Sequence, residues 1–178
     1  MKINVLFILI ISPFLILFQS NELSKNTFKK VSKEIKTVYD TENFSFESIS
    51  LADSINSQLK IKINDSNLFK IVNDSTLIGY AFFGKAPSKT DEFDYLVLFD
   101  SELIITKSKV LAYREDYGNE IGSKRWLKQF IGLQKDSEVR YGNEIVPISG
   151  ATISARSMTI AINDLLKTVS ILNKNGII

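Results

Sequence analysis

The 178-residue sequence contains no cysteine and no histidine, and these absences exclude several kinds of site. Without cysteine there is no disulfide, no thiolate zinc site, no Fe–S cluster and no c-type haem attachment. Without histidine there is no imidazole-based catalytic triad, and no side chain whose ordinary pKa lies near neutrality. Any redox or group-transfer chemistry therefore requires a reactive group that a cofactor supplies.

The chain also lacks a strong excess of charge of either sign. Its 22 lysines and arginines against 20 aspartates and glutamates give a net charge of +2, and the pI is about 8.6. A nucleic-acid-binding domain would show a pI above ~9 and a clustered basic face, whereas these lysines are scattered, so we expect no nucleic-acid partner. The length suits one domain, and the 44% apolar content is sufficient for a core.

The first twenty residues differ from the rest of the chain. Met1 and Lys2 precede an apolar run from Ile3 to Phe18, which is typical of a signal peptide or of an uncleaved anchor. We assign residues 1–20 to such a leader, which brings the chain into contact with the membrane. Because Lys2 precedes the run, the positive-inside rule predicts an extracytoplasmic location, in the periplasm or at the cell surface.

The remaining periodicity predicts two segments. Residues 21–66 form an N-terminal helical segment, and residues 67–178 form an α+β domain with an antiparallel sheet flanked by helices. The predicted elements are helices over Leu23–Tyr39, about Ser48–Lys60 and Ser123–Ile131, strands over Leu68–Val72, Thr76–Gly84, Tyr95–Phe99 and Leu103–Tyr113, a last strand near Glu138–Ile145, and a C-terminal helix to about Asn173.

One pentapeptide occurs twice, as Tyr117-Gly118-Asn119-Glu120-Ile121 and as Tyr141-Gly142-Asn143-Glu144-Ile145. Five residues at one offset do not make a structural repeat. The two copies are either two separate turns that lead into strands, or two loops that converge on one site.

The residues before the C-terminal helix are the most informative segment. Ser149, Gly150, Ala151 and Thr152 follow Pro147, and Ser154 comes two residues later. Unpaired N–H groups and the helix dipole at such a position favour a phosphate. The alternative is an ordinary turn in which Ser149, Thr152 or Ser154 caps the helix.

The string Ser149-Gly150-Ala151-Thr152 at the start of a C-terminal helix resembles the flavinylation motif of the FMN-binding domain family. This family includes the C subunit of the sodium-pumping NADH:quinone oxidoreductase and the G subunit of the Rnf complex. In it, a flavin transferase esterifies the threonine of the motif to the phosphate of FMN. The resemblance implies that Thr152 carries covalent FMN, and that Ser149, Gly150, Ala151 and Ser154 surround it.

The resemblance extends over roughly residues 68–170. Glu115 and Gly118 match the first and last residues of the family's Glu-Thr-Pro-Gly loop, with Asp116 and Tyr117 between them, and are thereby implied in FMN binding. Many members have an acid at the position of Val146. Segments 79–84, 115–122 and 140–148, with Phe82, Phe83, Tyr117, Tyr141 and Ile148, are the expected walls around the flavin ring.

The resemblance implies an exported electron-transfer protein that relays electrons between a membrane reductase and an extracytoplasmic acceptor, with a flavin transferase as a further partner. The alternative is an exported, non-catalytic binding module that has the same fold and has lost flavin. A stand-alone enzyme is disfavoured because no acid–base constellation is present. We expect a solvated acidic turn, and no cation site, at Asp91, Glu92 and Asp94, because these residues lack the spacing of a cation-binding loop.

Overall fold

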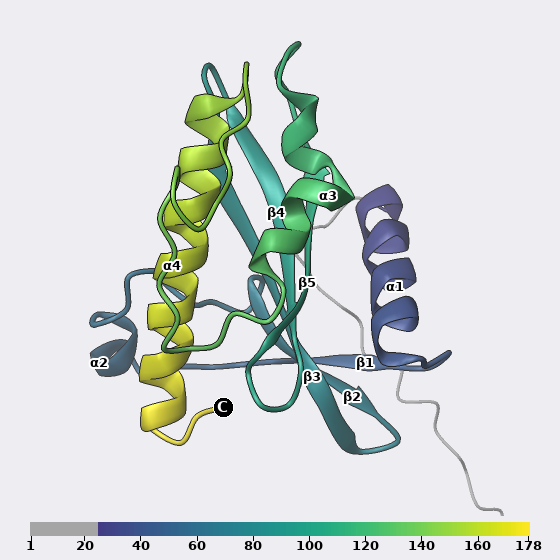
Figure 1. Cartoon of the computed structure of the whole chain (residues 1–178). Coiled ribbons are helices and arrows are strands. Elements are labelled where there is room, and N and C mark those ends of the chain that lie inside the picture. Colours follow the sequence, from purple (N-terminus) through teal and green to yellow (C-terminus); the bar gives the residue numbers. More distant parts are fainter. Residues whose placement is uncertain (1–24) are drawn as a thin grey trace, which may run out of the picture.

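The computed structural model describes residues 25–178, and the predicted leader lies outside them. Figure 1 shows the arrangement of the helices around the sheet. The elements are, in order, α1 (Lys25–Tyr39), β1 (Ser45–Ser48), α2 (Asp53–Asn56), β2 (Leu68–Asn73), β3 (Thr76–Pro87), β4 (Glu92–Phe99), β5 (Ile105–Ala112), η1 (Asn119–Gly122), α3 (Lys124–Leu127), η2 (Lys128–Phe130) and α4 (Thr152–Lys174).

The five strands form one antiparallel sheet in the order β1-β2-β3-β4-β5, which confirms the predicted α+β class. A hairpin turn at Asp100 joins β4 to β5. There the Asp100 carboxylate accepts hydrogen bonds from the backbone N–H groups of Glu102 and Ile104, at 3.0 and 2.9 Å.

Two elements between residues 41 and 66 differ from the prediction. Strand β1 was not predicted, because its only apolar residue is Phe46, whose ring packs 5.3 Å from that of Phe69. The helix predicted over Ser48–Lys60 is limited to α2. This helix ends at Asn56. The side-chain amide of Asn56 donates a hydrogen bond to Ile63 O at 2.8 Å and accepts one from Ile63 N at 2.9 Å, and these bonds turn the chain back.

The strand predicted near Glu138–Ile145 is also wrong. The segment forms only an isolated bridge between Tyr141 and Ile145. Gly142 has φ +86°, and the Glu144 carboxylate accepts a hydrogen bond from the backbone N–H of Arg140 at 2.8 Å. A left-handed residue and a local side-chain bond close a turn here instead of extending a strand.

The sheet separates two apolar clusters, because alternate residues of each strand point to opposite faces. One face, with Phe82, Phe93, Tyr95, Val97 and Phe99, packs against the apolar stripe of α4 and against α3. The other face, with Ala81, Leu96 and Leu98, packs against Val31 and Ile35 of α1. Figure 1 shows α4 and α1 on opposite sides of the sheet.

Within residues 25–178, no helix has the length and apolar character that a membrane crossing requires.

Candidate functional site

The start of α4 is an uncapped helix N-terminus. Gly150 turns the chain with φ +80°, Ala151 occupies the N-cap position, and no side chain accepts a hydrogen bond there. The structure therefore does not show the alternative in which Ser149, Thr152 or Ser154 caps this helix. Because the first bond of the helix runs from Ala155 N–H to Ala151 C=O at 2.9 Å, the N–H groups of residues 152–154 have no partner within the helix. This end of α4 can accept an anion.

The hydroxyls of the motif lie in different surroundings. Thr152 is exposed. Ser154 is only 2% exposed, and its Oγ lies 3.0 Å from the hydroxyl of Tyr113. Ser149 is exposed but does not line the cavity in front of the helix. Thr152 is therefore the motif hydroxyl residue that is both exposed and part of the cavity lining.

A cavity of about 550 Å³ lies between the start of α4, the loop that follows β5, and the β3–β4 hairpin loop. Its size falls within the roughly 300–1,000 Å³ of small-molecule sites. It is lined by Lys89, Thr90, Tyr113, Glu115, Asp116, Tyr117, Gly150, Ala151, Thr152, Ile153 and Ser154. The structure thus brings together most of the residues that the resemblance implied, from two segments over thirty residues apart.

Lys89, Thr90 and Tyr113 line the cavity without having been predicted. Tyr113 could have been found, because it lies two residues before Glu115 at the end of a predicted strand. No sequence pattern indicated that Lys89 and Thr90 would lie at the cavity, because their position results from the length of the β3–β4 hairpin.

Gly118 lies directly behind the turn of the motif. It has φ +84°, and a Cβ atom at this position would come within 2.8 Å of Ala151 Cβ and 3.1 Å of Gly150 O. No side chain other than hydrogen fits this contact. Gly118 therefore sets the distance between the loop and the start of α4 and does not line the cavity itself.

The carboxylate of Glu115 holds the β3–β4 hairpin loop. It accepts hydrogen bonds from Ser88 Oγ and Thr90 N at 2.6 Å, from Thr90 Oγ1 at 2.8 Å and from Asp91 N at 3.2 Å. The bonds from Ser88 and Thr90 stabilise the charged form and lower the pKa of Glu115 to about 2. These contacts support a role for Glu115 in orienting the β3–β4 hairpin loop.

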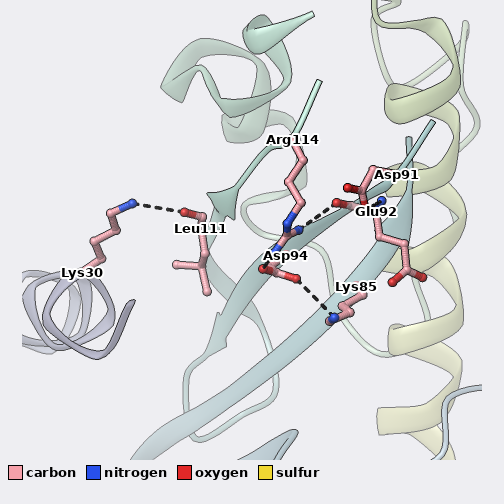
Figure 2. A network of polar contacts seen from close by, with 7 residues as sticks. All are labelled: Lys30, Lys85, Asp91, Glu92, Asp94, Leu111 and Arg114. Atoms are coloured by element: carbon pink, nitrogen blue, oxygen red, sulfur yellow. Dashed lines mark hydrogen bonds and ion pairs between the residues drawn. The ribbon is translucent and has the colours of Figure 1, made fainter. Parts of the chain in front are cut away.

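A second polar group fixes the strand ends beside this loop. Figure 2 shows Asp94 of β4 between Lys85 and Arg114. The Arg114 guanidinium is 2.5 Å from Asp94 Oδ2 and donates to Glu92 O at 2.8 Å, while Lys85 Nζ is 4.0 Å from Asp94 Oδ1. The neighbouring Asp94 carboxylate raises the pKa of Arg114. These ion pairs hold β3, β4 and the segment after β5 together immediately before Glu115.

Residues 25–178 contain no group of three or more acidic side chains that could hold a metal ion. In Figure 2 Asp91, Glu92 and Asp94 spread along the hairpin, and Asp94 serves the ion pairs with Arg114 and Lys85.

Several residues predicted to surround a flavin ring are elsewhere. Segment 79–84 lies within β3, where Phe82 is in the core on the α4 face and Phe83 packs on the opposite face. Ile148 is buried in the α4-side core. The ring of Tyr141 lies under the guanidinium of Arg156, at 5.1 Å. Of the predicted aromatic and apolar wall residues, Tyr117 is the one that lines the cavity.

A larger hollow of about 960 Å³ lies around the edge of β3 beyond Phe82, where β2 no longer pairs with it. Lys85, Asp94, Arg114 and Asp164 contribute polar groups to it. Thr152 is not among its lining residues, so this hollow is separate from the motif.

Residues 89–167 match the family model of the FMN-binding domain, which confirms the resemblance predicted from the motif. The matched segment contains the whole cavity lining from Lys89 to Ser154. Among solved structures, NqrC of Shewanella oneidensis is similar at 18% identity, over 78% of this chain and 72% of that chain, with a TM-score of 0.48. No curated protein matches the sequence significantly.

Proposed function

We propose, from the FMN-binding domain at residues 89–167, that this protein carries FMN as a phosphoester on Thr152 and serves in electron transfer. In this proposal it is exported by residues 1–20, a flavin transferase attaches the FMN, and a membrane reductase and an extracytoplasmic acceptor are its redox partners. The bound flavin would supply the redox chemistry, since the chain has neither cysteine nor histidine.

The observation that carries the proposal is the setting of Thr152. Its hydroxyl is exposed at an uncapped helix N-terminus and opens on the cavity of about 550 Å³. The free N–H groups and the dipole of α4 would stabilise the negative charge of a phosphoester at this hydroxyl. The small residues Gly150 and Ala151 leave the approach to it open.

Contacts within the protein would hold the attachment point of the phosphate, the start of α4, in a fixed position. The Oγ of the buried Ser154 lies 3.0 Å from the hydroxyl of Tyr113, and the Ser157 hydroxyl lies within hydrogen-bond distance of Pro87 O of β3 and of Ile153 O of α4. These contacts fix the first two turns of α4 against the strand ends. The attachment point would therefore be rigid, which favours a constant distance for electron transfer.

The proposal predicts that mutation of Thr152 abolishes flavin attachment. Co-expression of the full chain with a flavin transferase should add the mass of one FMN less one water to the wild type, as measured by mass spectrometry of the intact protein. Thr152→Ala should remain unmodified because it lacks the hydroxyl that forms the ester. Thr152 is exposed and caps no helix, so this variant should fold like the wild type.

Two variants serve as controls. Thr152→Ser retains a hydroxyl and should still be modified, while Thr76→Ala removes an exposed threonine at the far hairpin between β2 and β3 and should be fully modified. An unmodified wild type, under conditions in which the transferase modifies another substrate, would overturn the proposal. Modification of Thr152→Ala would overturn the choice of residue.

A further inference from the structure

Tyr117 is the most exposed large apolar residue in the part of the chain that the structure describes, at 82%. It lines the same cavity as Thr152 and takes part in no ring contact or hydrogen bond with residues 25–178. We propose that the Tyr117 ring stacks on the isoalloxazine ring of the flavin at Thr152 and holds it at the cavity. This inference rests on the proposed function and adds a residue that positions the flavin ring.

The backbone on both sides of Tyr117 is fixed. On one side Glu115 binds the β3–β4 loop through four hydrogen bonds. On the other side Gly118 lies against Ala151, and Ile121 is fully buried. The loop therefore presents an unattached ring from a rigid base, so that little conformational entropy is lost when the ring binds a ligand.

The second copy of the pentapeptide shows that this exposure does not follow from the local sequence. Gly118 and Gly142 have φ values of +84° and +86°, and the isoleucines that end the two copies, Ile121 and Ile145, are both fully buried. The tyrosines differ, because Arg156 covers Tyr141 whereas no described side chain covers Tyr117.

Both copies reach the first turns of α4, one through Ala151 and the other through Arg156. The two copies thus converge on one helix end, but only the first faces Thr152. The ring of Tyr117 and the half-exposed side chain of Ile153 are the apolar groups at the cavity that the fold leaves uncovered. A planar, largely apolar ring tethered at Thr152 would find these two groups at the same cavity, and aromatic pairs favour offset stacking.

The test uses flavin fluorescence, which close contact with a phenol ring lowers. In the flavinylated full chain, Tyr117→Leu should raise the emission per bound flavin roughly fivefold, because aromatic pairs favour the stacked form by about that factor. Tyr117→Trp should keep the emission low, since indole also stacks on and quenches flavin. Tyr141→Leu is the matched control and should leave the emission unchanged.

The outcomes separate the two proposals. Absence of the FMN mass increment in the wild type would overturn the function proposed for Thr152. With the increment present, equal emission from wild type and Tyr117→Leu, or an equal rise in Tyr117→Leu and Tyr141→Leu, would overturn the role of Tyr117. Thermal unfolding of each variant checks that the fold is intact. We expect no loss of stability in Tyr117→Leu, because the side chain that it removes is 82% exposed.

Discussion

Glu115 joins two loops of the cavity through one carboxylate. All four of its hydrogen-bond donors come from residues 88–91, so the charge holds the β3–β4 hairpin loop against the loop that carries Tyr117. A neutral side chain would accept fewer and weaker hydrogen bonds than the carboxylate. The position of Lys89 and Thr90 at the cavity therefore depends on the ionisation of Glu115.

This dependence predicts a loss of stability in acid. The pKa of Glu115 falls from 4.5 to about 2 on folding, so its contribution is complete above about 4.5 and disappears as the pH falls towards 2. Glu115→Gln should lower the midpoint of thermal unfolding at about pH 6, and the difference from the wild type should shrink at about pH 3.

The exposed Glu120 of the same loop is the matched control, and Glu120→Gln should change little at either pH. A difference between wild type and Glu115→Gln that stays constant with pH would contradict the ionic role of these hydrogen bonds.

At the scale of elements, the site is the junction of the loop after β5 with the start of α4. The two copies of the pentapeptide supply the same left-handed glycine, but only Gly118 touches the motif. A Cβ at Gly118 would lie 2.8 Å from Ala151 Cβ and 3.0 Å from Tyr113 Oη, whereas a Cβ at Gly142 would meet nothing within 4 Å. Substitutions at Gly118 and Gly142 therefore impose the same backbone strain, and only the substitution at Gly118 also disturbs the contact with the start of α4.

We expect both Gly118→Ala and Gly142→Ala to lose about 1–2 kcal/mol of unfolding free energy, the cost of a left-handed alanine. Gly118→Ala should lose more, because the loop must also move away from Ala151, and it should reduce flavin attachment at Thr152. Urea denaturation measures the first effect and intact mass the second. Equal losses of stability and equal attachment in the two variants would show that the Gly118 contact is unimportant.

For the whole molecule, the sheet separates the site from α1. Hydrogen bonds and ion pairs, in addition to apolar packing, hold α1 to the other face. Lys30 donates to Leu111 O at 3.2 Å, Tyr39 donates to Phe99 O at 2.7 Å, and Glu34 pairs with Lys107 and Lys109. Burial opposes the charge of Glu34, but the hydrogen bonds from the two lysines outweigh it and lower its pKa. None of these residues lines the cavity at Thr152.

Tyr39→Phe should therefore reduce stability without affecting the site. The hydroxyl of Tyr39 is largely buried, which raises its pKa, and its loss should cost about 1 kcal/mol in urea denaturation. Flavin attachment should stay complete. Tyr117→Phe, at an exposed ring, should leave the unfolding free energy unchanged. Loss of attachment in Tyr39→Phe would contradict the separation of the two faces.

The sequence was most informative where local pattern determines structure. The alternation of apolar residues predicted β2 to β5, the helical spacing predicted α1 and α4, and the string Ser149 to Thr152 pointed to the family that residues 89–167 match. The sequence did not predict β1, because the packing of Phe46 depends on Phe69 of the partner strand. It predicted a strand at residues 138–145, where Gly142 and the hydrogen bond from Arg140 N to Glu144 form a turn instead.

Local sequence was sufficient to predict β2 to β5, α1, α4 and the motif, and it shows the absence of cysteine and histidine. Tertiary packing determines that Thr152 is exposed while Ser154 is hydrogen-bonded to Tyr113, that Glu115 holds a hairpin loop, and that Tyr117 is exposed while Arg156 covers Tyr141. The physical reason is that periodicity and turn chemistry act between near neighbours in the chain. Exposure and hydrogen bonding at the site depend on segments that only the packing of the sheet and α4 brings together.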